Sequence, residues 1–467
     1  MHHAPDSSPL WKRHRKNPEI VAALNHLDPV RPRADLDVAL DIARGAASAA
    51  FVYLDALGAQ QAADTAVQRQ HHGQPLSPLD GRIVSVKDLF DVAGQVTTAG
   101  STVLANRPAA VADAPVVARL RAAGTVLIGR TQMTEFAFSG VGLNPHHGTP
   151  ANPVMAAIDP VPRVPGGSTS GGAVSVATGA AWAALGTDTG GSIRIPAALQ
   201  GLVGFKNTQQ RTPNTGSIPL SPSLDTSCAV TRTVQDAVAV HAVLSTQPCQ
   251  PEWRPLSAWR FGVVESLLLD QLDPAVAQDF ERALAHLSRL GARICRMALP
   301  ALDDLPVLQQ DGGIPAAESW AWHQTLLAER GAQYDPRVAT RIRRGATITP
   351  EALARLHDLR ARWIARMVTE LADVDFVLSP TVPLIAPPLA PLVADEAEFF
   401  RVNALLLRNP AVVNLLDGCA ISLPCHRMGE APVGLMAWTT GGRDEALLGA
   451  ALAIEEALAP MRGVAAR

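Results

Sequence analysis

The sequence predicts a globular protein of the α/β class. From Leu79 onward, short apolar strand patterns alternate with amphipathic helix patterns, which is typical of a sheet flanked by helices. The chain of 467 residues is 47% apolar and 18% charged, so it can bury a large hydrophobic core. It contains no internal repeat and no low-complexity block that would favour another architecture.

The N-terminal part is expected to be a polar tail followed by two helices. The tail covers residues 1–34, and a solvated terminus explains its basic cluster at residues 12–16 better than a binding site does. Two alanine-rich amphipathic helices, around residues 36–46 and 56–69, flank a short strand at residues 50–54.

Proline and glycine mark the ends of two later helices. Pro115 begins one helix and Gly124 ends it. Pro274 begins the other, which places its apolar residues on one face and stops at Gly291. Strands are expected at residues 82–86, 126–128, 293–297 and 375–378.

Charge and cysteine usage exclude several classes of function. A net charge of −3 gives no reason to expect a nucleic-acid partner. No apolar stretch is long enough to span a membrane, and the first residues lack the apolar core of a signal peptide. The five cysteines are scattered without a CxxC pair, which fits a reducing compartment. We therefore expect a cytoplasmic protein that binds neither nucleic acid nor a membrane.

Two long Gly/Ser-rich stretches, at residues 165–172 and 186–194, have apolar flanks and are expected to be loops held inside the core. In the second stretch a glycine turn delivers Ser192 to the first turn of a predicted helix. Free backbone N–H groups in such a turn form a concave anion site, and the helix dipole adds partial positive charge. This arrangement suits the oxyanion that forms when a serine attacks a carbonyl.

A serine nucleophile needs a base, and Lys87 is the best candidate. No histidine is near either stretch in the sequence except His146 and His147, and the adjacent histidine pairs do not suggest a metal site. Of the 40 basic residues only four are lysines, and beyond the tail only Lys87 and Lys206 remain. Lys87 ends an apolar strand, where an amine can lose its charge near neutral pH, as arginine cannot. Lys206 is expected to be structural.

These motifs resemble the amidase signature family. The matching segments are Gly166-Gly167-Ser168, the run from Gly186 to Ala197, and Val84-Ser85-Val86-Lys87-Asp88. Members of that family share a lysine, a serine on a cis peptide bond, and a nucleophilic serine 24 positions later, which is the spacing of Ser168 and Ser192. The resemblance extends over about residues 35–460.

The resemblance implies a single domain over residues 35–467, with a signature core at about 79–235 and a large mixed sheet covered by helices on both faces. It also implies a role for each motif residue. Ser192 would attack the amide carbonyl, and Ser168 would pass the proton to Lys87. The remaining roles are an oxyanion hole made by the N–H groups of Thr189, Gly190, Gly191 and Ser192, and loop support by a charge pair of Asp188 and Arg194.

The expected activity is hydrolysis of a small linear carboxamide through an acyl-enzyme, without a cofactor or a metal. One alternative is a transamidase like the glutaminase component of tRNA-dependent amidotransferases, or a ureide hydrolase acting on biuret- or allophanate-type substrates, that needs a small partner chain. Another is a catalytically silent scaffold. A homodimer is left open. The stretch with Trp320 and Trp322, together with an apolar C-terminal half, would permit an aromatic or an aliphatic acyl group without requiring either.

Overall fold

The computed structural model describes residues 30–462. The predicted basic cluster at residues 12–16 and most of the predicted tail lie outside these residues. Helix α3 begins at Pro32, so the last three residues of the predicted tail belong to a helix. Its buried residues include Leu36 and Leu40, which pack with alanines of the following helix.

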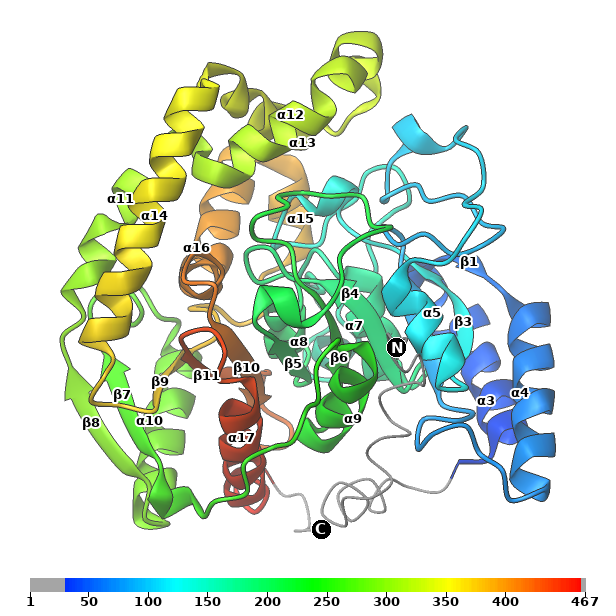
Figure 1. Cartoon of the computed structure of the whole chain (residues 1–467), viewed down its shortest axis with the longest axis horizontal. Coiled ribbons are helices and arrows are strands. Elements are labelled where there is room, and N and C mark those ends of the chain that lie inside the picture. Colours follow the sequence, from blue (N-terminus) through cyan, green and yellow to red (C-terminus); the bar gives the residue numbers. More distant parts are fainter. Residues whose placement is uncertain (1–29, 463–467) are drawn as a thin grey trace, which may run out of the picture.

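All eleven strands of the described chain belong to one mixed sheet (Figure 1). Strand pairs β2–β3, β2–β4, β7–β8 and β7–β9 are parallel, and the others are antiparallel. In spatial order the strands are β1 (Phe51–Leu54), β3 (Val126–Thr131), β2 (Ile83–Lys87), β4 (Ala183–Thr187), β6 (Ser227–Thr231), β5 (Val203–Lys206), β10 (Cys419–Pro424), β11 (Gly434–Thr439), β9 (Phe376–Pro380), β7 (Arg260–Val264) and β8 (Arg293–Met297).

Helices cover both faces of the sheet, as β10 demonstrates. Side chains alternate between the two faces of a strand. Accordingly, Ile421 lies in a core with helix α17, whereas its neighbour Ala420 lies in a second core with α16. The helices are α3 (Pro32–Arg44), α4 (Ala56–His71), α5 (Pro115–Ala122), α6 (Pro153–Ala156), α7 (Ser170–Thr178), α8 (Arg194–Leu199), α9 (Val234–Leu244), α10 (Pro274–Arg289), α11 (Leu305–Leu308), α12 (Gly313–Arg330), α13 (Pro336–Arg343), α14 (Pro350–Glu370), α15 (Leu389–Ala394), α16 (Glu396–Leu415) and α17 (Asp444–Leu458).

The predicted α/β class and the covered mixed sheet are confirmed, and the elements agree closely with their predicted ranges. Helix α10 carries its buried residues on one face, as predicted. Strand β3 is longer than expected because Gly129 does not end it. Instead, Gly129 allows the backbone of β1 to approach, and a Cβ at this position would collide with the carbonyl of Tyr53.

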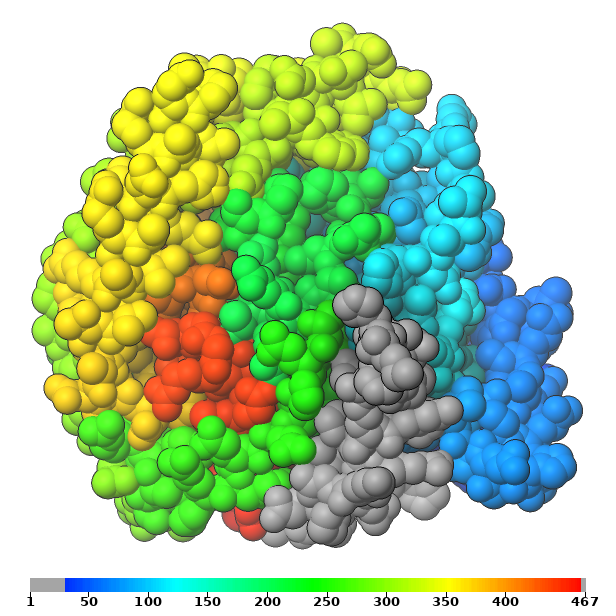
Figure 2. Space-filling model, viewed as in Figure 1, coloured from blue at the N-terminus to red at the C-terminus, as the bar shows by residue number. Residues whose placement is uncertain are grey.

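Helices α12 and α13 form a cap at one end of the molecule, coloured yellow-green in Figures 1 and 2, and the yellow helix α14 runs from that end along one side. Trp320 and Trp322 of α12 pack against a core cluster below this cap, and Trp322 contacts the ring of Phe136. Neither tryptophan lines the pocket described below. Within residues 30–462, every helix is too short or too polar to cross a membrane.

Candidate active site

Lys87 and Thr187 lie side by side because their strands are neighbours. β2 and β4 are parallel and paired, so their carboxyl ends meet at one edge of the sheet, where ligands of such sheets usually bind. Lys87 ends β2 and Thr187 ends β4. The Nζ of Lys87 donates a hydrogen bond to Thr187 Oγ1 at 3.1 Å and another to Ser168 Oγ at 2.8 Å.

Lys87 is fully buried, with none of its surface exposed. Burial lowers the pKa of Lys87 to about 7, and the carboxylates of Asp188 and Asp225 act against this shift. A buried amine resists protonation because the low-dielectric interior disfavours its charged form. Near neutral pH a large fraction of Lys87 is therefore neutral and able to accept a proton.

Ser168 lies in the first Gly/Ser-rich loop, and the peptide bond between Gly167 and Ser168 is cis, as the family resemblance implied. Ser168 is fully buried and precedes helix α7. A link from Ser168 to Ser192 was also expected. Among the hydrogen bonds of residues 30–462, none joins these two hydroxyl groups, although the N–H of Thr169 donates to the backbone oxygen of Ser192 at 3.3 Å.

Ser192 lies in the turn that leads from β4 into α8. Helix α8 begins at Arg194, and the N–H of Ile195 already donates to the Gly191 carbonyl at 2.7 Å. Gly191 has a φ of 121°, a conformation that favours glycine. The sequence placed Ser192 in the first helical turn, and this agrees with the structure because helix boundaries differ by a residue or two between definitions.

Three of the four predicted oxyanion donors are free to bind a ligand. Within the described part of the chain, the N–H groups of Thr189, Gly190 and Ser192 have no acceptor. The N–H of Gly191 instead donates to the carboxylate of Asp188 at 2.9 Å. Of the four predicted donors, Gly191 therefore differs from the other three in having an acceptor within its own turn.

Asp188 and Arg194 form a fully buried ion pair of 2.8 Å. The N–H of Ile193 and the side-chain amide of Asn414 also donate to Asp188. Burial alone would raise the pKa of Asp188, but the charge of Arg194 and these donated hydrogen bonds hold it well below its usual range. The carboxylate therefore stays ionised and fixes the turn that carries Ser192.

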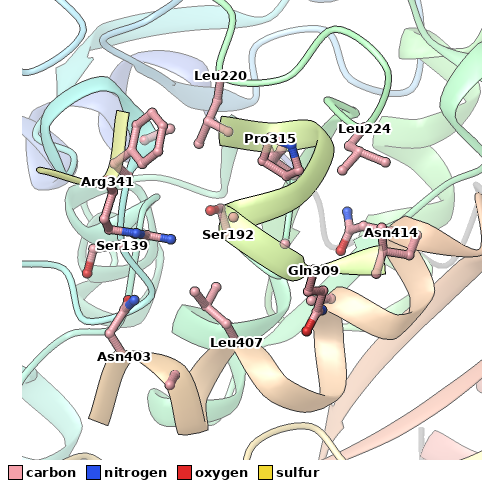
Figure 3. Close-up of a pocket in the computed structure, with 18 of the residues that line it drawn as sticks. Ser139, Ser192, Leu220, Leu224, Gln309, Pro315, Arg341, Asn403, Leu407 and Asn414 are labelled. Atoms are coloured by element: carbon pink, nitrogen blue, oxygen red, sulfur yellow. The ribbon is translucent and has the colours of Figure 1, made fainter. Parts of the chain in front are cut away.

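A pocket of about 490 Å³ opens beside Ser192. Its walls are mainly apolar and come from the turn at Thr189 and Gly190, the 220–224 loop, the cap helices and α16. Neither Lys87 nor Ser168 lines it, so Ser192 is the member of the predicted triad that a ligand would meet. Figure 3 shows Ser192 within this pocket, with Leu220 and Leu407 among the surrounding side chains.

Arg341 of α13 supplies positive charge to the pocket. Its guanidinium extends into the pocket beside Ser192 (Figure 3) and lies over the ring of Phe138. Its Nη1 is buried without a hydrogen-bond partner among the described residues. Burial, with a smaller contribution from the nearby charge of Arg344, lowers the pKa of Arg341 to about 10, so the group remains charged at neutral pH.

Sequence reasoning missed Thr187, Asp225 and Arg341. Thr187 could have been found, because it ends an apolar strand inside the signature run. Arg341 could not, since it lies in an arginine-rich segment that pattern alone places on the surface. Lys206 is buried and donates to the carbonyl oxygens of Asn207 and Gly418, which agrees with the predicted structural role.

Comparison with known proteins identifies the family. The Amidase family model matches residues 42–448. The chain belongs to the amidase signature family. A relative from Comamonas testosteroni, 2-amino-5-chloromuconic acid deaminase, is 38% identical over 408 residues, covering 86% of each chain. A component of the glutamyl-tRNA(Gln) amidotransferase from Salinispora tropica is 30% identical over 459 residues, covering 88% of this chain and 90% of that component.

A solved amidase crystal structure matches the fold with a TM-score of 0.82 and 32% sequence identity, covering 92% of this chain and 96% of that one. The sequence resemblance stated above is thereby confirmed over most of the chain. As a member of the amidase signature family with amidase relatives, the protein is a hydrolase of C–N bonds.

Proposed function

We propose that this amidase hydrolyses a linear carboxamide through an acyl-enzyme on Ser192, and that the acyl part of its substrate carries a carboxylate. The observation that supports the chemistry best is the fully buried Lys87 amine, which donates to Ser168 Oγ at 2.8 Å. A base with a pKa of about 7 is well matched to proton transfer at neutral pH.

In the proposed reaction, Ser192 Oγ bonds to the amide carbon while its proton passes to Ser168, whose own proton passes to neutral Lys87. Collapse of the tetrahedral intermediate breaks the C–N bond, and the same relay returns a proton from Lys87 to the leaving nitrogen. Water then attacks the acyl-enzyme by the same route and releases the carboxylic acid. The Ser168–Ser192 hydrogen bond would form with substrate present, since catalytic hydrogen bonds are often long in free enzymes.

The N–H groups of Thr189, Gly190 and Ser192 would stabilise the oxyanion of the intermediate. They lie in one turn and lack protein acceptors among residues 30–462. Asp188 and Arg194 would act as supports, since their buried pair holds this turn without exposing either group to the pocket. Donors fixed in advance stabilise developing charge without the cost of reorganisation.

The proposed carboxylate on the acyl part rests on Arg341. The buried Nη1 of Arg341 lacks an acceptor among the described residues and loses hydrogen-bond energy, which a carboxylate would restore with charge-assisted bonds. The relative from Comamonas testosteroni is named as a deaminase of an organic acid, 2-amino-5-chloromuconic acid, which agrees with an acidic substrate. The apolar walls would contact the carbon chain between the two ends.

The triad is tested with Ser192→Ala, Ser168→Ala and Lys87→Met on a panel of aliphatic, aromatic, glutamine and ureide amides. We expect each variant to lose at least about 1,000-fold in kcat, because triad members act as a unit. A serine-directed phosphonate should label Ser192 in the wild-type protein and not in Ser192→Ala. Undiminished turnover by Lys87→Met would disprove the proposed relay.

The acyl preference is tested with Arg341→Met and a matched control, Arg343→Met, which removes an exposed arginine of the same helix. For an amide with a terminal carboxylate, Arg341→Met should lower kcat/KM by about 10- to 100-fold, the range expected for a charged hydrogen bond. An uncharged amide of equal length should show little change. Equal losses on both amides, or none on either, would contradict the proposal.

A second candidate is a transamidase or ureide hydrolase that needs a small partner chain, which similarity to the amidotransferase component of Salinispora tropica favours. It predicts activity on glutamine or a ureide only after a partner is added. Full activity of the purified chain alone would exclude it. The homodimer remains a prediction, and sedimentation velocity would test it.

A further inference from the structure

Asp225 is a buried carboxylate that the proposed chemistry does not use. It lies in the loop before β6 and is 5% exposed. Its Oδ1 accepts a hydrogen bond from Thr189 Oγ1 at 2.5 Å. Its Oδ2 accepts from the backbone N–H groups of Leu220 at 3.0 Å and Ser221 at 3.1 Å. The two backbone N–H groups can only donate, so the group at this position must present an acceptor oxygen to them.

Asp225 forms no ion pair with any residue between 30 and 462. A buried charge without a cationic partner costs free energy, and burial raises the pKa of Asp225 to about 6 despite the donated hydrogen bonds. Asparagine would fill the same volume without this cost, with its oxygen toward the N–H groups of Leu220 and Ser221 and its NH2 group donating to Thr189 Oγ1, but it would lose the charge-assisted bond. The carboxylate therefore accepts from all three partners at once.

Those donors come from two different parts of the site. Thr189 begins the turn whose free N–H groups face the pocket, and Leu220 and Leu224 belong to the pocket wall. The residue after Asp225 contributes to the same link, because the Thr226 carbonyl accepts from the N–H of Asp188 at 2.9 Å. Residues 225 and 226 thus hold the turn through Thr189 Oγ1 and the N–H of Asp188. The Asp188 carboxylate holds it through the N–H groups of Gly191 and Ile193.

We propose that Asp225 is a positioning residue for hydrolysis: through the hydroxyl of Thr189 it fixes the oxyanion-binding turn against the acyl wall at Leu220. The proposal rests on the proposed function, because it assigns Asp225 to the geometry of the same site. Contact of the substrate with the pocket wall at Leu220 and alignment of the oxyanion-binding N–H groups are therefore coupled through the Asp225 carboxylate. If Asp225 only stabilised the 220–225 loop, removing the Thr189 hydroxyl would leave the rate of hydrolysis unchanged.

The experiment compares Thr189→Val, Thr189→Ser, Asp225→Asn and the double variant Thr189→Val/Asp225→Asn. Thr189→Val removes only the hydroxyl and leaves the other bonds of Asp225 in place. We expect its kcat to fall by about 10- to 100-fold, since a small misplacement of reacting groups can cost about 100-fold. KM should change by less than about threefold, because a turn that acts on the transition state leaves substrate binding largely unaltered.

Thr189→Ser keeps the hydroxyl and should recover most of this loss. Asp225→Asn weakens the same link by removing its charged acceptor, so its kcat should also fall, by no more than in Thr189→Val. The double variant should be no slower than Thr189→Val alone, because without the hydroxyl no link to residue 225 remains to be weakened. The matched control is Thr178→Val, which removes the hydroxyl of a half-buried threonine at the end of α7 that donates to the Val174 carbonyl. The rate of Ser192 phosphonylation, which depends on the oxyanion donors, should fall in parallel with kcat.

Wild-type kcat in Thr189→Val would overturn the proposal, as would losses that multiply in the double variant. If Asp225→Asn does not fold, the comparison of Thr189→Val with Thr189→Ser still decides. Activity in Ser192→Ala would reject the proposed function itself. The Thr189 and Asp225 variants test only the positioning role, so the two failures can be told apart.

Discussion

The chemistry proposed for this site depends on a single amine. Lys87 is the only lysine besides Lys206 within the described residues, and it lies on an apolar strand with two hydroxyl groups as its hydrogen-bond partners. Arginine at this position would remain charged at every accessible pH and could not accept a proton. The interior thus provides a proton acceptor without a histidine.

This residue predicts the pH dependence of activity. The proposed base is the neutral amine, so kcat/KM should rise as Lys87 loses its proton, with a midpoint near pH 7 and a plateau above about pH 8. Below the midpoint the slope should approach tenfold per pH unit. A pH profile on a neutral amide avoids titration of the substrate, and a flat profile between pH 6 and 9 with chemistry limiting would contradict it.

The signature residues were predictable because each belongs to a local pattern. Ser168, Ser192, Asp188 and Arg194 all lie in two short segments with recognisable spacing, and Lys87 stands out by its residue type. Asp225 and Arg341 were not predictable in this way. The roles proposed for them rest on contacts with residues far away in the chain, and no local pattern reports such contacts.

At the scale of elements, the turn before α8 is held by one buried ion pair. The guanidinium of Arg194 contacts both oxygens of Asp188 and the amide oxygen of Asn414 on α16. The pair therefore joins the turn that carries Ser192 to a helix more than 200 positions later in the sequence. Helix α8 itself has only six residues, so its position depends on such contacts rather than on intrinsic helix stability.

Arg194→Met is expected to destabilise the protein strongly, because it leaves the buried Asp188 carboxylate without its cation. Removing one partner of a buried pair typically costs about 3–5 kcal/mol. The measurement is the urea midpoint of unfolding followed by circular dichroism. The control, Arg401→Met, breaks an exposed pair with Glu398 and should leave the midpoint nearly unchanged. Similar midpoints for both variants would contradict this role of Arg194.

The helices and strands that were predicted, fewer than half of those in residues 30–462, carry local signals in the sequence. Proline at the start and glycine after the end define α5 and α10 locally. Strand β3 was underestimated because its extension past Gly129 depends on pairing with β1, a partner that is distant in sequence. The order of the eleven strands is likewise a non-local property, and it was not predicted; the family resemblance implied only a large mixed sheet.

At the scale of the whole molecule, one sheet joins the two halves of the chain. Strands of residues 51–231 form one side and strands of residues 260–439 the other, and they meet where β5 pairs with β10. A core cluster crosses this seam, with Phe205 from one side and Ile421 and Leu435 from the other. The halves therefore share both backbone hydrogen bonds and buried apolar surface.

This continuity predicts a single cooperative thermal transition. Differential scanning calorimetry should show one peak, and intrinsic fluorescence and circular dichroism should change at the same temperature, because neither half can unfold without exposing the shared core. Two separated peaks would contradict the single-domain expectation and place a domain boundary at the β5–β10 seam.

The pocket described beside Ser192 also has a consequence for how such enzymes diversify. The groups proposed to break the bond all precede residue 200, whereas most side chains around the pocket, including Arg341 and Leu407, follow residue 300. A descendant could therefore acquire a preference for a different acid through changes confined to the C-terminal third of its gene product. Exchanging that third between two relatives should transfer the substrate preference. The rate of bond cleavage should stay that of the enzyme that supplies the first two thirds.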